Sequence, residues 1–184
     1  MEWLGSEVIE LICHPQTPAS NVEGISCIFD LDRGDGDMIL WFIVRGDPES
    51  IVIPASAKPY RTDGLWRSTC FELFVKTGPE SYLEMNFSPS SQWALYGFES
   101  YRMGMTSLPV DAPPSAHCWT YPEDRVFGMT CVPRLKGLVD RAVALSAVIE
   151  ETDGTKSYWA IAHPPGKPDF HHATCFAAAL PAPR

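Results

Sequence analysis

Two glutamates and an asparagine lie in neighbouring segments of the chain, with a spacing that places their side chains on one surface. Glu72 lies in residues 70–75, and Glu84 and Asn86 lie in residues 82–88; apolar and polar positions alternate in both segments. Because successive side chains of a β-strand point to opposite faces, these three groups share one face and apolar residues form the other. Carboxylates and amides gathered on a surface can hold pairs of hydroxyl groups, share a proton or bind a cation.

The turn between the two segments determines which of these groups meet. If the Thr-Gly-Pro sequence after the first segment closes a short loop, Glu72 lies directly opposite Glu84, whereas a register two residues over places Glu72 opposite Asn86. Opposed carboxylates have Cβ atoms about 5 Å apart and repel, unless a cation, a shared proton or a donor-rich ligand lies between them. The structural alternative is an ion pair with Arg61 or Arg67, and Arg61 is therefore a further candidate at this surface.

A pair of nearby carboxyl groups is also the catalytic set of a retaining glycosidase, in which one acts as nucleophile and the other as acid. Glu72 and Glu84 are the residues available for this chemistry. A hairpin face is more open than a catalytic cleft, and no second acid–base constellation accompanies the pair. We therefore expect a non-catalytic protein and keep a glycoside-active enzyme as the alternative.

A second cluster of reactive side chains lies in the proline-rich segment 163–172. His163, Asp169 and His171 match the residue types of a two-histidine, one-carboxylate metal site. In a loop with three prolines, Asp and His side chains also commonly cap backbone groups of the loop itself. We expect the capping role and no cofactor, with a divalent metal ion as the alternative.

Composition restricts the class of protein and of partner. The 184 residues suit one domain spanning 1–184, and 45% hydrophobic content supports a sizeable core. A formal net charge of −9 argues against binding to nucleic acid or to an anionic membrane surface. No apolar run is long enough for a membrane span, and the N-terminus lacks the pattern of a signal peptide. We therefore expect a cytoplasmic location, where six cysteines without a C-x-x-C arrangement are expected to be free thiols.

The elements that must position these groups are short strands. Seventeen prolines leave few windows for a long helix. Alternating or apolar segments predict strands at residues 7–14, 21–32, 38–44, 70–75, 82–88, 92–101, 118–121, 126–132, 142–151, 157–163 and 173–180. Residues 102–116 form a long proline-rich loop that covers either a site or a sheet edge. This pattern predicts an all-β fold with little helix: a two-sheet antiparallel β-sandwich of jelly-roll or immunoglobulin-like type, with a closed barrel as runner-up.

Several short motifs together resemble the bacterial DOMON-like domain proteins, which are related to family 9 carbohydrate-binding modules. The motifs are Asp63-Gly64-Leu65-Trp66, Thr69-Cys70-Phe71-Glu72, Asn86-Phe87-Ser88-Pro89-Ser90, Trp93-Ala94 and the closing His-Pro-Pro-Gly-Lys-Pro-Asp-Phe-His. The resemblance covers nearly the whole chain. It implies a β-sandwich that binds sugar or haem.

Carbohydrate-binding members of that family clamp a sugar between two tryptophan rings. The resemblance implies Trp66 as the first ring and Trp159 as the candidate for the second. Haem-binding members use Met or His axial ligands, and no position of this chain matches them clearly. We therefore expect a carbohydrate or similar polyol ligand held by Trp66, Glu72, Glu84, Asn86, Trp159 and Arg61, with haem as the alternative. An exposed sheet edge also permits a homodimer.

Overall fold

The protein is an all-β fold with almost no helix, as the sequence predicted. The computed structural model describes residues 8–31, 38–135 and 140–179. The strands are β1 (Val8–Cys13), β2 (Val22–Leu31), β3 (Met38–Gly46), β4 (Cys70–Lys76), β5 (Tyr82–Phe87), β6 (Trp93–Phe98), β7 (Thr106–Ser107), β8 (Ser115–Tyr121), β9 (Val126–Val132), β10 (Ala142–Glu150), β11 (Lys156–Ala160) and β12 (Ala178–Ala179). Single 3₁₀ turns complete the described part: η1 (Pro48–Ser50), η2 (Leu65–Arg67), η3 (Pro122–Asp124) and η4 (Ala173–Cys175).

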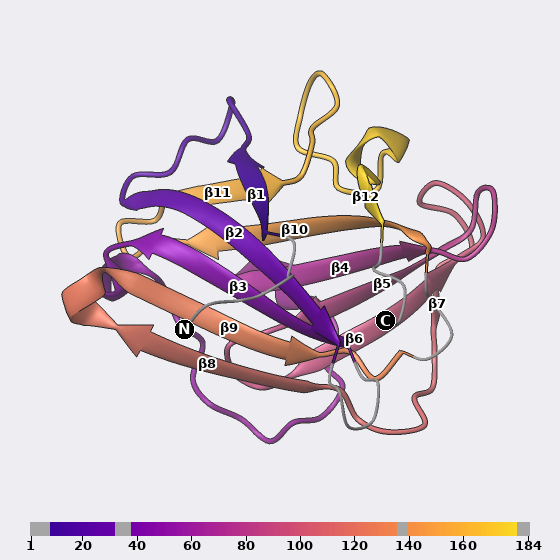
Figure 1. Ribbon diagram of the computed structural model, residues 1–184, viewed down its shortest axis with the longest axis horizontal. Helices are drawn as coiled ribbons and strands as arrows, with labels where there is room; N and C mark the ends of the chain where they lie inside the picture. Colours follow the sequence, from indigo (N-terminus) through magenta and orange to yellow (C-terminus); the bar gives the residue numbers. More distant parts are fainter. Residues whose placement is uncertain (1–7, 32–37, 136–139, 180–184) are drawn as a thin grey trace.

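The strands form one continuous antiparallel sheet that curls back on itself (Figure 1). Its order is β7-β6-β5-β4-β10-β11-β1-β2-β3-β9-β8, and β12 pairs with β10. β1 joins the two halves, because residues 8–11 pair with β2 and residues 12–13 pair with β11. The prediction of two separate sheets is therefore not confirmed. We call β1, β2, β3, β9 and β8 the β3 leaf, and β11, β10, β4, β5, β6 and β7 the β4 leaf.

The main apolar core lies between the two leaves. The Phe71 ring on β4 packs against Phe42 on β3, with ring centroids 4.9 Å apart, and against Phe127 on β9 at 6.1 Å. All three side chains are fully buried. They come from the inward positions of strands that alternate with a period of two, so burial of this face follows from the sequence pattern. The six cysteines are free, as predicted, and four of them are buried.

The β4–β5 hairpin adopts the second of the two registers that the sequence permits. Glu72 lies opposite Asn86, and Glu84 lies opposite Phe74. The expected short loop is wrong: the connection is longer, because the carbonyl of Ser81 accepts hydrogen bonds from the amides of residues 77 and 78. This loop shifts the pairing by two residues and leaves the two carboxylates diagonal to each other.

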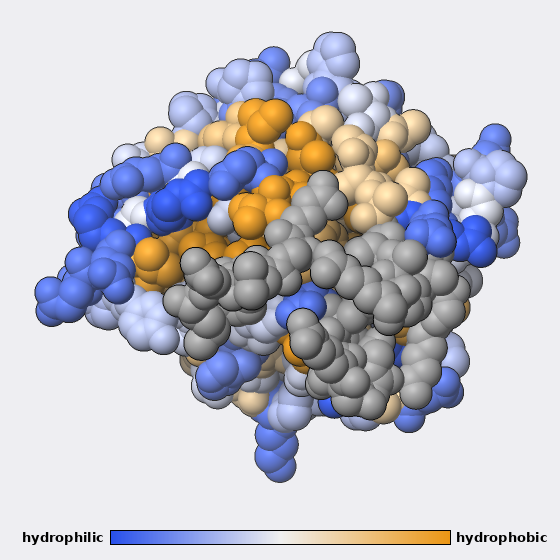
Figure 2. Space-filling model, in the orientation of Figure 1, coloured by the Kyte–Doolittle hydropathy of each residue, from blue (hydrophilic) through white to orange (hydrophobic). Residues whose placement is uncertain are grey.

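The β3 leaf presents apolar side chains on its outer surface. Figure 2 shows them gathered over β1 and β2, and Val8 and Ile12 on β1 are 55% and 57% exposed. An exposed apolar patch of this kind is a candidate contact surface. Within the described ranges, no helix is long and apolar enough to cross a membrane.

Candidate functional site

The outer face of the β4 leaf is covered by other parts of the chain. A second apolar cluster lies on it, built from outward side chains such as Phe74, Tyr82 and Phe98 together with Phe170 and Cys175 from the segment after β11. The predicted last strand at residues 173–180 is wrong. It is replaced by the turn η4 and the two-residue strand β12, because this segment folds over the sheet and only its end pairs with β10.

A cavity of about 320 Å³ remains between this covering and the sheet. Four aromatic rings line it: Trp66, Phe98, Tyr158 and Phe170. Its polar lining consists of Glu72, Glu84, Arg102 and His171. An aromatic wall with a few convergent polar groups is the usual composition of a site for a small ligand.

Glu72 lies at the floor of this cavity on β4. Its side chain is buried, with 3% of its surface exposed, and Ser146 on the neighbouring strand β10 donates a hydrogen bond of 2.8 Å to its Oε2. Burial raises the pKa of Glu72 to about 8, and the negative charge of Glu84 acts in the same direction. The hydrogen bond from Ser146 and the positive charge of Arg102 oppose this shift. Glu72 therefore retains a proton at a pH where an exposed glutamate is ionised.

Glu84 is the second carboxyl group at the floor. The Asn86 amide, two residues along β5, donates a hydrogen bond of 2.9 Å to its Oε1, and Nε2 of His171 lies 3.7 Å from its Oε2. Burial raises the pKa of Glu84, while the Asn86 hydrogen bond and Arg102 lower it. The asparagine that the sequence placed on the polar face thus supports this carboxyl group directly.

His171 joins the carboxyl floor to the covering segment. Its Nδ1 lies 2.8 Å from the Tyr82 hydroxyl, which also accepts a 3.1 Å hydrogen bond from the Arg102 backbone amide. Burial, together with the nearby Arg102 charge, lowers the pKa of His171 to about 4. The ring is therefore uncharged at neutral pH. We assign the proton to Nε2, so that Nδ1 accepts from Tyr82 and Nε2 faces Glu84.

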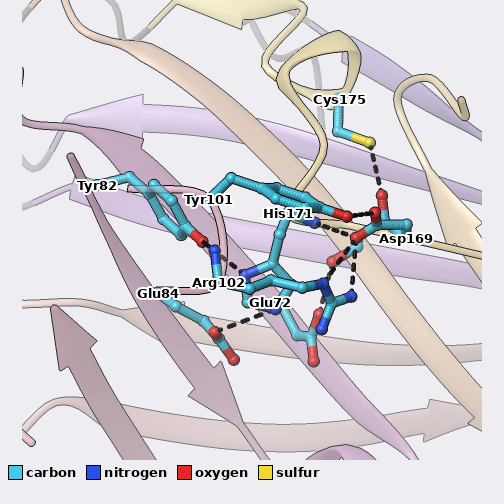
Figure 3. A network of polar contacts seen from close by, with 9 residues as sticks. Glu72, Tyr82, Glu84, Tyr101, Arg102, Asp169, His171 and Cys175 are labelled. Carbon is cyan, nitrogen blue, oxygen red and sulfur yellow. Dashed lines mark hydrogen bonds and ion pairs between the residues drawn. The ribbon is translucent and has the colours of Figure 1, made fainter. Parts of the chain in front are cut away.

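An ion pair holds the covering segment to the loop after β6. Two nitrogens of the Arg102 guanidinium donate to Oδ1 of Asp169, at 2.7 and 3.3 Å, and the Tyr101 hydroxyl donates to Oδ2. Figure 3 shows these groups converging on Asp169, with Glu72 and Glu84 below them in the view. The backbone of Arg102 is in the left-handed region, with φ of 54°. We call Tyr101, Arg102 and Asp169 the clasp.

Trp66 stands at the rim of the cavity on the turn η2. Gly64 precedes this turn with a φ of 77°, which favours glycine. The indole is 37% exposed and meets Tyr96 edge to face, with ring centroids 6.1 Å apart. Arg61 lies behind Tyr96, with its guanidinium 5.2 Å from the ring centroid, and it pairs with Asp63 at 2.7 Å. Arg61 thus supports the rim and does not line the cavity.

Two predicted residues lie away from the cavity. Trp159 points to the opposite face of the sheet, where it is buried in the main core and its Nε1 donates to Ser157. His163 contacts the carbonyl of Ile12 at 2.8 Å and the ring of His14. The three residues of the alternative metal site, His163, Asp169 and His171, therefore do not form one cluster. Among the residues that the structure describes, no group of three or more His, Cys, Asp or Glu side chains could hold a metal ion.

Of the two residue types that serve as haem axial ligands, the cavity lining holds one histidine, His171, and one methionine, Met105. Both ring nitrogens of His171, its one lining histidine, already face protein groups, Tyr82 and Glu84.

Sequence reasoning missed Arg102, Phe98, Tyr158 and Phe170 as lining residues. Phe98 could have been found, because alternation places it on the same face as Tyr96. Arg102 comes from an irregular loop that has no periodicity. Its one signal is indirect: two buried carboxylates need a nearby cation.

Comparison with known proteins identifies a fold relative. No protein-family model and no curated protein matches the chain. A solved structure described as a "putative carbohydrate-binding protein" from Bacteroides uniformis matches it with a TM-score of 0.65 and 13% sequence identity, covering 93% of this chain and 84% of the other. At this identity the likeness concerns the fold alone. The chain shares the curled β-sheet fold of that carbohydrate-binding-like protein.

Proposed function

We propose that this protein is a non-catalytic binding module that holds a carbohydrate or a similar polyol in the cavity on the β4 leaf. The observation that carries the proposal is the pair of buried carboxyl groups, Glu72 and Glu84, at the floor of a cavity with the exposed ring of Trp66 at its rim. Burying such groups costs free energy unless they acquire partners, so their placement favours a ligand that supplies hydrogen-bond donors.

The two kinds of lining group suit the two surfaces of a pyranose. The flat C–H face of a sugar packs on an aromatic ring, for which Trp66 and Phe98 are available. Hydroxyl groups donate to the oxygens of Glu72 and Glu84, and the Arg102 guanidinium donates to a hydroxyl or ring oxygen. Asn86 and Ser146 orient the carboxyl groups from behind.

Two likenesses support a sugar ligand. The motifs around Trp66, Glu72 and Asn86 resemble those of the DOMON-like proteins related to family 9 carbohydrate-binding modules. The structural neighbour is itself described as carbohydrate-binding. The family assignment is part of the proposal and is tested with it.

The test is a glycan panel measured by calorimetry against the unmodified protein, Glu72→Gln and Trp66→Ala. At pH 9, above the pKa of about 8 of Glu72, we expect each variant to weaken binding by roughly 1.5–3 kcal/mol, through loss of a charged hydrogen bond and of ring stacking respectively. Glu123→Gln and Tyr121→Ala, exposed positions on η3 and β8, are the matched controls and should bind normally. The proposal fails if no glycan binds, or if Glu72→Gln binds equally well and only unfolds at a lower temperature.

A glycoside-active enzyme is the second candidate. The raised pKa of Glu72 beside Glu84 favours it, because a glycosidase keeps one carboxyl group protonated as the acid. Chromogenic glycosides provide the assay. Hydrolysis that disappears in both Glu72→Gln and Glu84→Gln would replace the binding module with an enzyme.

A further inference from the structure

The cavity holds more acidic than basic groups. Its titratable lining comprises Glu72 on β4, Glu84 on β5, Tyr158 on β11, Arg102 after β6 and His171 in the covering segment. Arg102 is the one cation among them, and Asp169 already accepts from two of its nitrogens. His171 is uncharged at neutral pH. A ligand in the cavity therefore meets two carboxyl groups and a guanidinium whose charge is already balanced.

Each carboxyl group also accepts few hydrogen bonds from the protein. In the described part of the chain, Ser146 donates to Glu72 and Asn86 donates to Glu84, while His171 lies 3.7 Å from Glu84. A buried carboxylate that is well stabilised accepts two or three hydrogen bonds. Both groups line the cavity, so both can accept from a ligand.

The walls around these groups are aromatic. Trp66, Phe98, Tyr158 and Phe170 present rings to the cavity. Ring faces attract a cation, and the attraction grows as the cation loses water. Acidic groups below and aromatic rings around are a combination suited to an organic ammonium ion. A metal ion fits less well, because it requires more oxygen ligands than two carboxyl groups supply.

We propose that the carbohydrate bound in this cavity is an amino sugar, and that its protonated amine lies between Glu72 and Glu84. This inference rests on the proposed function and names its ligand class. An ammonium group carries three N–H donors and one positive charge. It therefore supplies the donors that the carboxyl groups lack and offsets their repulsion.

Binding of an amino sugar should release a proton from the cavity. Binding of an ammonium ion favours the ionised form of both carboxyl groups, so the complex releases the proton that Glu72 retains in the free protein. Affinity for the amino sugar should rise with pH from 5 to 7, because release of the Glu72 proton on binding becomes less costly as the pH rises. A neutral sugar should lack this rise.

The experiment is calorimetry with matched pairs of sugars: D-glucosamine against D-glucose and N-acetyl-D-glucosamine, and D-galactosamine against D-galactose. We expect at least one amine to bind about tenfold or more tighter than its neutral counterparts at pH 7, the equivalent of about 1.4 kcal/mol. In the Glu72→Gln, Glu84→Gln double variant, this preference should fall to less than about threefold, because the charge-assisted bonds are absent. Glu123→Gln should keep the preference.

A second measurement does not depend on the folding of the double variant. Titrating the unmodified protein with D-glucosamine in two buffers of different ionisation enthalpy reports the protons released, and we expect release with the amine and none with D-glucose. If neutral sugars bind and every amine binds no tighter, or if the preference survives in the double variant, the inference is overturned and the proposed function stands. If no sugar binds, both are overturned.

Discussion

The two faces of the β4–β5 hairpin are equally buried but chemically different. The inner face carries Phe71 and Met85, both fully buried in the core between the leaves. The outer face carries Glu72, Glu84 and Asn86, of which none is more than 5% exposed. Apolar burial stabilises the fold, whereas burial of a carboxyl group opposes it.

The two faces of the hairpin are covered by different parts of the chain. The inner face is covered by the other leaf of the same sheet, through rings on β3 and β9. The outer face is covered by a loop segment held by the clasp, and a cavity remains beneath it. A fold selected for stability alone would fill that space with apolar side chains, so the retained carboxyl groups support the proposed ligand site.

The largest effect is expected on the inner face. Phe71→Ala removes the ring that packs against Phe42 and Phe127 and should lower the free energy of unfolding by about 3–5 kcal/mol, measured by denaturant titration. Phe71→Leu, the conservative control, should cost less. A loss below about 1 kcal/mol for the alanine variant would mean that the two leaves do not depend on this contact.

On the outer face, a substitution should raise the free energy of unfolding, and the size of this change should depend on pH. Because the pKa of Glu72 is raised from 4.5 to about 8, the folded protein holds this proton more tightly than the unfolded chain. That stabilisation is complete below pH 4.5 and is lost as the pH rises towards 8. The Glu72→Gln variant has no ionisable group at this position and does not lose stability in this way. Its free energy of unfolding should therefore be higher than that of the unmodified protein by about 1–3 kcal/mol at pH 7, with little difference at pH 4.5.

His171 makes the free energy of unfolding depend on pH in the opposite direction, in both the unmodified protein and the Glu72→Gln variant. Its lowered pKa means that its contribution is present above pH 6.5 and is lost as the pH falls towards 4, so it cancels in the difference between the two proteins. Glu123→Gln, at an exposed position, should follow the unmodified curve. Parallel curves for Glu72→Gln and the unmodified protein would show that burial does not retain a proton on Glu72.

Asn86→Ala tests whether the outer polar groups act together. The variant leaves Glu84 without its amide donor and should cost about 1–3 kcal/mol in unfolding free energy. In a Glu84→Gln background the cost should be smaller, because the charge that needs the donor is gone. Equal costs in both backgrounds would indicate that Asn86 acts through packing alone.

The smallest effect is expected at the clasp. Asp169→Asn weakens its contacts with Arg102 and Tyr101, but the Arg102 side chain is 50% exposed, so the global cost should be about 1 kcal/mol or less. Hydrogen exchange should report the change locally, as faster exchange in residues 169–172. Asp111→Asn, in an exposed part of the loop before β8, is the control. Unchanged exchange would mean that other contacts hold the segment.

The alternation of apolar and polar residues along the chain determined which face of its strand each of these residues occupies. It separated the inner residues Phe71 and Met85 from the outer residues Glu72, Glu84 and Asn86, and the structure keeps that division. Hydrophobic periodicity suffices here because each strand buries its apolar face against a neighbour. It could not decide the register, because a shift of two residues leaves every side chain on the same face.

Only the tertiary structure decided the rest. Trp159 and Tyr158 lie on opposite faces of one strand, and both faces are covered, so sequence could not tell which ring reaches the cavity. Arg102 and Asp169 come from loops 67 residues apart, and their contact depends on how those loops fold over the sheet. Periodicity reports which face of a strand a side chain occupies, whereas a cavity depends on what the chain places above that face.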